Sequence, residues 1–175
     1  QKGIDLLLTA LPRILRSTDA TIVIAGSGDA SICERIDDQV ARSNGRVVFV
    51  RAATEPLVHR LFAGADMVLL PSLHEPCGLV QLYAQRYGAL PVVRAVGGLD
   101  DTVADDKTGF KFKKLAPDEL AQSVPVAVYT YHERPEQVRM MQYHAMQQPT
   151  GWSPAPQQHA ARYRRDPAPP PPAPR

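Results

Sequence analysis

The sequence has few of the residues that define several classes of protein. Its two cysteines, Cys33 and Cys77, are too few for a disulfide framework and lack the spacing of a zinc site, so we expect a reducing compartment, the cytoplasm. No apolar run approaches the roughly 20 residues that span a bilayer, and we expect no membrane association. The 20 Lys and Arg against 18 Asp and Glu leave a net charge of +2, which argues against a nucleic-acid surface.

An initiating methionine is also lacking. The chain begins with Gln1 and enters a helical pattern at once, so we expect it to be the interior of a longer protein. Under that expectation, a missing signal peptide carries no information about localisation. The length of 175 residues with 44% hydrophobic side chains suits one globular domain with an ordinary core.

Short β-branched runs alternate with helical patterns through the first two thirds of the chain. The runs are apolar at nearly every position, which is typical of strands buried on both faces. Strands that alternate with helices of this length predict right-handed crossovers and an α/β fold with a parallel sheet. The expected strands are 21–25, 47–50, 67–70 and 91–93, and the expected helices are 4–17, 31–43, 55–65 and 80–87.

The pattern weakens after Phe112. A helix start is indicated at Pro117, but Pro125 lies inside its continuation and disfavours a long helix. A last helix is predicted over residues 153–163, because Ser153 can cap it and Pro154 and Pro156 suit its first turn. The final segment 166–175 is proline-rich and is expected to be disordered or polyproline II, either as a solvated tail or as a ligand for a proline-recognising domain.

The loop after the third expected strand holds the most reactive side chains. Ligands of an open parallel sheet bind beyond the carboxyl ends of its strands. The loop contains Glu75 and Cys77 and leads into the helix 80–87, whose first N–H groups suit a phosphate. Glu75 is either a favourable charge at a helix start or a carboxylate that meets a polar substrate, and Cys77 is either a reactive thiol or a small packed side chain.

Two glycine pairs follow other expected strands. Gly97 and Gly98 follow the fourth strand, where their N–H groups either bind an anion or sugar hydroxyls or simply form a turn. Gly26 and Gly28 follow the first strand but lack the third glycine of a dinucleotide fingerprint. The histidines are too scattered for a metal triad, so no metal site is expected.

The segment 71–103, PSLHEPCGLVQLYAQRYGALPVVRAVGGLDDTV, closely resembles the signature of bacterial glycogen synthases and plant starch synthases. The likeness extends to QKGID at 1–5, HRLFAGAD at 59–66 and TGF at 108–110, and it covers residues 1–165. It implies a GT-B glycosyltransferase, in which two Rossmann-like domains close over a nucleotide sugar. Residues 1–165 would then be the C-terminal, nucleotide-sugar-binding domain without its first strand, with helices on both faces of a Rossmann-like parallel sheet.

The resemblance also implies an activity and its partners. The family transfers glucose from ADP-glucose, or UDP-glucose in some members, to the non-reducing end of an α-1,4-glucan, with retention of configuration and without a metal or other cofactor. A second partner would be the acceptor-binding N-terminal domain, which lies outside this sequence.

The family's site residues map onto this sequence position by position. The resemblance makes Glu75 the active-site carboxylate near the transferred glucose. The predicted substrate-binding residues are Lys2 at the donor phosphates, Cys77 and Gly78 along the glucose pocket, Leu79 and Val80 with backbone N–H groups toward the diphosphate, and the pair Gly97 and Gly98.

Two positions depart from the family. Val80 stands where the family commonly has Thr, and Ala53 aligns with a Tyr that lies under the adenine. Both changes are expected to weaken donor binding, because one removes a hydroxyl donor to phosphate and the other removes a stacking contact. They leave two alternatives open: a non-catalytic Rossmann-like binding module, or a related GT-B glycosyltransferase that uses another nucleotide sugar.

Overall fold

The computed structural model describes residues 1–150 and residue 160. Of the predicted helix 153–163, only residue 160 is among the described residues. The proline-rich segment 166–175 lies outside them. The elements, in chain order, are α1 (Ile4–Ser17), β1 (Ile22–Gly26), α2 (Ala30–Arg42), β2 (Val47–Arg51), α3 (Glu55–Gly64), β3 (Met67–Leu70), α4 (Val80–Tyr87), β4 (Leu90–Arg94), α5 (Gly97–Thr102), β5 (Phe110–Phe112), α6 (Pro117–Glu133) and α7 (Pro135–Met146).

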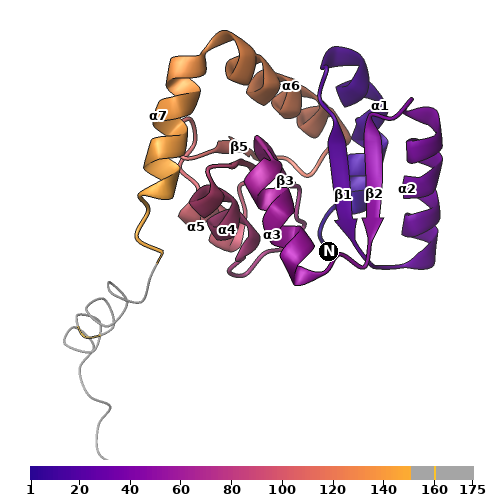
Figure 1. Ribbon diagram of the computed structural model, residues 1–175, viewed down its shortest axis with the longest axis horizontal. Helices are drawn as coiled ribbons and strands as arrows, with labels where there is room; N and C mark the ends of the chain where they lie inside the picture. The colour runs from indigo at the N-terminus through magenta and orange to yellow at the C-terminus, as the bar shows by residue number, and fades with distance from the viewer. Residues whose placement is uncertain (151–159, 161–175) are drawn as a thin grey trace, which may run out of the picture.

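All the strand pairs are parallel, which confirms the predicted α/β class. β1 pairs with β2, with Ile22 opposite Val47, and β3 pairs with β4, which pairs with β5. The predicted strands and helices between positions 4 and 94 all form, with ends that shift by no more than one residue. The expected single sheet is divided, however: within residues 1–150, β1–β2 and β3–β4–β5 are separate sheets (Figure 1).

The three-stranded sheet is covered by helices on both faces, as predicted. Side chains of a strand alternate between its faces, so neighbouring residues enter different cores. Leu90 and Val92 of β4 join the main core with α1, α6 and α7, whereas Val93 packs with Leu99 of α5. Phe62 of α3 packs against α4 on that second side of the sheet. The main cluster of fully buried side chains includes Leu11, Ile14, Leu90, Leu120 and Met141.

The prediction of burial on both faces is wrong for β1 and β2. Ile24 and Val47 point into the main core, but Val23 and Val48 on the opposite face are 46% and 42% exposed. An apolar run can therefore be covered on only one side, because its composition does not report which helices reach it. Among the described residues, the outer face of this two-stranded sheet is open to solvent.

Three elements were not predicted from the sequence: β5, α5 and α7. In addition, α6 continues through Pro125 to Glu133. An interior proline costs a helix about 3 kcal/mol. The buried stripe of α6, which includes Leu120, Val124 and Ala127, continues across the proline and packs against α1 and β5, and this burial outweighs the lost hydrogen bond.

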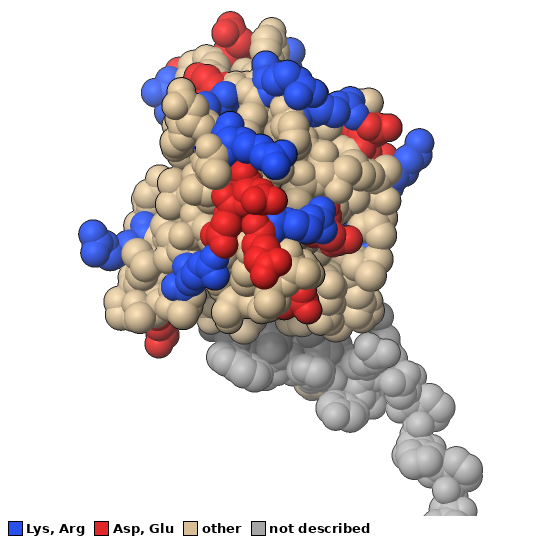
Figure 2. All heavy atoms as spheres, turned by 90° about the vertical axis from the view of Figure 1, so that its right-hand side faces the viewer, with Lys and Arg blue, Asp and Glu red and all other residues tan. Residues whose placement is uncertain are grey.

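Charged groups are mixed on the surface. On the face shown in Figure 2, Lys and Arg side chains border a central group of Asp and Glu side chains. An ion pair between Arg51 and Asp37 joins β2 to α2. Within the described part of the chain, none of the helices has the length and apolar character needed to cross a membrane.

Candidate active site

Two loops at the carboxyl ends of β3 and β4 meet backbone to backbone. The Gly98 N–H donates a hydrogen bond to the Glu75 carbonyl at 2.9 Å. A Cβ at Gly97 would lie 2.2 Å from the Glu75 carbonyl oxygen, and a Cβ at Gly98 would lie 1.9 Å from the Cys77 carbonyl oxygen. Only glycine fits at such distances, so the paired glycines bring the loop after β4 against the loop that carries Glu75.

This contact corrects part of the sequence reasoning. The Gly98 N–H is already bonded to protein, so it is not a donor for a bound anion. Gly98 serves close packing of the two loops, and Gly97, with a φ of 49°, begins α5 rather than a simple turn. A substrate-binding role stays a prediction for both Gly97 and Gly98.

Glu75 is the buried carboxylate of the site, with 8% of its surface exposed. The Lys2 ammonium forms an ion pair with its Oε2, and the Ser72 hydroxyl donates to the same oxygen at 3.3 Å. The Lys2 side chain is 59% exposed, so one side of the ammonium faces the carboxylate while much of it faces solvent. The fold thus brings together two predicted site residues that lie 73 positions apart.

The loop that carries Glu75 is fixed at its other end by a residue that the sequence reasoning missed. Arg94, the last residue of β4, donates from Nε to the Ser72 carbonyl at 2.7 Å and from Nη2 to the Leu73 carbonyl at 2.5 Å. The Leu73 N–H donates to the Gln1 carbonyl at 2.9 Å. Arg94 could have been found in the sequence, because a cation at the end of an otherwise apolar strand is unusual and indicates a specific partner.

The start of α4, five residues after Glu75, has N–H groups without a backbone partner among the described residues. The first turn is closed by the Tyr83 N–H, which donates to the Leu79 carbonyl at 2.9 Å, so the preceding N–H groups need partners outside the helix. Leu79 and Val80 are 56% and 38% exposed, and Cys77 is exposed before them. These N–H groups and the helix dipole suit an anion, although the side chain of Val80 adds no hydroxyl.

A second missed residue, Gln81, lies directly beneath this turn. Its side chain is fully buried, and its Nε2 lies 3.1 Å from the Cys77 carbonyl oxygen and 2.9 Å from that of Gly78. Gly78 has a φ of 72°, and a Cβ there would lie 2.5 Å from the Gln81 Oε1. Glycine is favoured at position 78 by its left-handed backbone conformation, and a side chain there would also displace the Gln81 amide.

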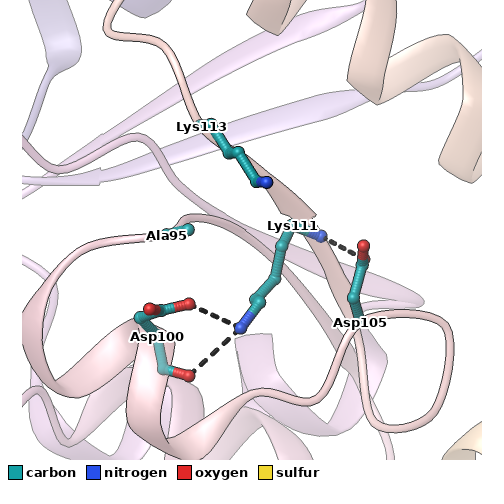
Figure 3. A pocket seen from close by; sticks show the side chains of 5 residues that line it. All are labelled: Ala95, Asp100, Asp105, Lys111 and Lys113. Atoms are coloured by element: carbon teal, nitrogen blue, oxygen red, sulfur yellow. Dashed lines mark hydrogen bonds and ion pairs between the residues drawn. The ribbon is translucent and has the colours of Figure 1, made fainter.

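A hollow of about 580 Å³ lies farther along the same edge, lined by Ala95, Asp100, Asp105, Lys111 and Lys113 (Figure 3). The Lys111 ammonium contacts both the carboxylate and the carbonyl of Asp100, at 2.5 and 3.1 Å. The Lys111 N–H donates to the Asp105 carboxylate at 2.7 Å. Asp100, Asp105 and Lys111 thus bond to one another, and they leave the Lys113 ammonium as the remaining charged group of this hollow.

Residues 1–150 and 160 contain no group of three or more His, Cys, Asp or Glu side chains that is placed to hold a metal ion. The arrangement that they do contain is a buried carboxylate, a cation and a helix start at the carboxyl ends of parallel strands. The cation and the helix start suit an anionic ligand at this edge of an α/β protein, and the carboxylate beside them suits a polar group of that ligand such as a hydroxyl.

Comparisons with known proteins assign the family. The sequence model described as "Glycosyl transferases group 1" matches residues 1–127, and the chain belongs to this family. The chain is 38% identical over 165 residues to the glycogen synthase of Xanthomonas campestris pv. campestris, covering 94% of this chain and 34% of that protein. The predicted resemblance to glycogen and starch synthases is therefore confirmed.

Solved structures confirm the fold. The catalytic domain of Starch Synthase IV from Arabidopsis thaliana, bound to ADP and acarbose, matches with a TM-score of 0.80 at 27% identity, covering 94% of this chain and 36% of that one. HepE of Anabaena, in complex with UDP-glucose, shares the fold with a TM-score of 0.72 at 22% identity, covering 93% of this chain and 45% of that one. The chain spans about a third of the length of the glycogen synthases that it matches.

Proposed function

We propose that this chain is the nucleotide-sugar-binding part of a glycosyltransferase of the glycogen and starch synthase type. The proposed reaction transfers glucose from ADP-glucose to the non-reducing end of an α-1,4-glucan and retains the anomeric configuration. The observation that carries the proposal is the buried Glu75 carboxylate, paired with Lys2 and lying next to the start of α4. The identity to glycogen synthases and the ADP and acarbose bound to the starch synthase neighbour support this choice of substrates.

The donor diphosphate is proposed to bind at the start of α4. The N–H groups of Leu79 and Val80 would donate to phosphate oxygens, with the positive end of the helix dipole behind them. Lys2 adds an ammonium that is paired with Glu75 and is 59% exposed along its side chain. Cys77 and Gly78 would line the pocket of the transferred glucose, since they lie between Glu75 and these donors.

Glu75 is proposed to act at the anomeric carbon. In the transfer, the bond between glucose C1 and the diphosphate breaks and ADP leaves, while the acceptor hydroxyl bonds to C1 and its proton passes to the departing phosphate oxygen. A buried carboxylate held by Ser72 and Lys2 can stabilise the positive charge that develops at C1, or attack C1 directly. Both roles require a fixed carboxylate, and two loops hold this one in place.

The acceptor glucan and a second, acceptor-binding domain are proposed partners. The chain spans about a third of the length of the glycogen synthases that it matches, so the remaining length of those proteins leaves room for such a domain. Closure of a second domain over the site would exclude water from the transfer.

A different nucleotide sugar is the second candidate, because Ala53 offers no ring for stacking under an adenine. Val80, which contributes no hydroxyl at the phosphate site, weakens binding of either donor and favours a decayed binding module instead. HepE, which shares the fold, was solved with UDP-glucose. The two donors differ in the base, so a comparison of adenine and uracil nucleotides distinguishes the candidates. A decayed binding module would bind neither.

Titration calorimetry of the chain with ADP-glucose, ADP and UDP-glucose tests the proposal. We expect ADP-glucose to bind more tightly than UDP-glucose, and Lys2→Gln to weaken ADP binding by about tenfold or more, because a hydrogen bond to a charged group contributes roughly 1.5–3 kcal/mol. Lys107→Gln is the matched control, since Lys107 is an exposed lysine in the turn before β5. Equal effects of the two substitutions, or tighter UDP-glucose binding, would contradict the proposed donor site.

A further inference from the structure

The Gln81 amide joins the two loops of the site from below. Besides the carbonyl oxygens of Cys77 and Gly78, its Nε2 lies 3.0 Å from the Thr102 Oγ1 of α5. The Thr102 hydroxyl in turn donates to the Gly98 carbonyl. Because the Gly98 N–H donates to the Glu75 carbonyl at 2.9 Å, hydrogen bonds run without interruption from Gln81 through α5 to the backbone of Glu75.

Gln81 is an unfavourable residue for filling space alone. It is fully buried, and its Oε1 has no hydrogen-bond partner among the described residues. A buried polar atom without a partner costs about 1–3 kcal/mol, a cost that an apolar side chain at this position would not carry. The amide nevertheless provides what an apolar side chain lacks, which is a donor to the carbonyls of the turn that follows Glu75.

A neighbouring glutamine provides a comparison within the same helix. Gln85 lies one turn farther along α4, is equally buried, and also has an unpartnered Oε1 among the described residues. Its Nε2 lies 3.3 and 3.4 Å from the carbonyl oxygens of Thr102 and Thr108. Gln85 therefore supports the end of α5 and the turn before β5, and its hydrogen bonds within the described residues do not reach the turn at Cys77 and Gly78.

We propose that Gln81 is a positioning residue for the active-site carboxylate. Its amide holds the turn at Cys77 and Gly78 against α5, and thereby fixes the backbone of Glu75 relative to the free N–H groups at the start of α4. The catalytic meaning of this position rests on the function proposed above for Glu75. The fixing of the loop itself does not, and it can be measured without activity.

Amide hydrogen exchange on the 175-residue chain tests the fixing of the loop. Gln81→Met keeps the volume of the side chain and removes the donor, and Gln85→Met is the matched control. We expect exchange of the Gly98 N–H to accelerate by about tenfold or more in Gln81→Met relative to Gln85→Met, under conditions of equal global stability. Thr102→Val, which breaks the same chain of hydrogen bonds one step farther on, should act like Gln81→Met and serves if that variant does not fold.

Kinetics of a full-length enzyme that contains this chain test the effect on transfer. Gln81→Met is expected to lower kcat by about tenfold or more and to leave the KM for the glucan unchanged, whereas Gln85→Met keeps kcat near that of the parent. Equal exchange and equal kcat in the two variants would overturn the proposal. If Gly98 exchange accelerates in Gln81→Met but the parent enzyme shows no glucosyl transfer, the proposed function is refuted and the role of Gln81 in holding the loop is supported.

Discussion

The α-carbon of Gly98 lies so close to the Cys77 carbonyl that a Cβ on Gly98 would be 1.9 Å from the carbonyl oxygen. This contact explains why α5 begins with two glycines, although glycine is a poor helix former. The helix is only six residues long, and its position is set by contact with the loop after β3. The geometry of the candidate site therefore depends on the absence of a side chain at position 98.

Gly98→Ala is expected to destabilise the fold by about 1–3 kcal/mol or more, because the added methyl group must displace backbone on one side or the other. Urea unfolding of the chain measures this change. Gly64→Ala is the control, since a Cβ at Gly64 meets open space at the end of α3. That variant should be neutral or more stable by up to roughly 1 kcal/mol. Equal stability of Gly98→Ala and the parent would show that the two loops separate freely.

Glu75→Gln is expected to lower kcat by about a hundredfold or more in a full-length enzyme, since removal of one preorganised electrostatic group typically costs 10² to 10³ in rate. The fold should persist, because an amide still accepts from Ser72 and Lys2 stays solvated. Asp100→Asn, which removes the ion pair with Lys111 near α5, is the control and should change kcat by less than about threefold. The measurement is glucosyl transfer into glycogen. Retained activity in Glu75→Gln would mean that the Glu75 carboxylate is only a favourable charge at the start of α4.

The parts of the fold that follow from local patterns were predictable, and the parts that depend on packing were not. The run at 67–70 and the helix at 80–87 were predicted with their observed ends, since the first is a short continuous apolar run and the second is ended by Gly88. By contrast, α5 forms through contact with a distant loop, and β5 has only three residues, of which Lys111 is polar. α7 did leave a signal: Pro135 followed by Glu136 is a recognisable helix start.

The residues of the candidate site were likewise predictable only in part. Glu75, Cys77 and Lys2 were identified because their residue types suggest chemistry and because the surrounding motif resembles a known family. Arg94 and Gln81 were missed because their importance lies in the backbone carbonyls that they contact. Contacts from a side chain to backbone carbonyls leave no periodic trace in a sequence, so the structure was needed to find them.

Restoration of the two family residues in the donor site is expected to tighten nucleotide binding. Ala53→Tyr with Val80→Thr should improve ADP binding by roughly 1–3 kcal/mol together, allowing for incomplete additivity within one pocket. Calorimetry on the parent and the double variant measures the change. Val126→Thr, at a valine of α6 that is 60% exposed, is a control for the Val80 substitution. Unchanged affinity would mean that the base and phosphates are held by other residues.

The hydrogen bond between Tyr131 and Asp66 is expected to make stability depend on alkaline pH. The Tyr131 hydroxyl donates to the Asp66 carboxylate at 2.6 Å, and this bond raises the pKa of Tyr131 above its ordinary value of 10.0. The folded chain thus favours the protonated phenol. Its contribution to stability is fully present below pH 10 and is lost as the pH rises through the higher pKa of the folded state.

Urea midpoints of the parent and Tyr131→Phe between pH 8 and about pH 11 measure this dependence. The parent should be the more stable protein at pH 8, and the difference should shrink above pH 10. Tyr129→Phe is the control on the same helix, at a side chain that is 58% exposed. A difference that stays constant across this range would mean that the phenol does not titrate in the way the geometry requires.

The open edges of the two sheets lead to the last prediction. Within residues 1–150, β1 is paired on one edge only, with β2, and β3 is paired only with β4. In Figure 1, β1 is the strand of its sheet on the side of β3. The Gln1 carbonyl accepts from the Leu73 N–H just beyond the end of β3, and Gly3 packs against Pro71. A strand that runs into Gln1 parallel to β3 would extend this contact backward along the open edge of β3.

We predict that such a strand joins the two sheets into one. The chain can be extended at Gln1 with the segment that precedes the matched region in the Xanthomonas glycogen synthase, and compared with the same extension that has a proline at its centre. The intact strand should raise the free energy of unfolding by roughly 2 kcal/mol or more, since each net hydrogen bond contributes about 0.5–1.5 kcal/mol and apolar burial adds to this. The proline should remove much of that gain, because it cannot donate to a neighbouring strand. Equal urea midpoints of the two extended chains would show that the space between β1 and β3 does not accept a strand.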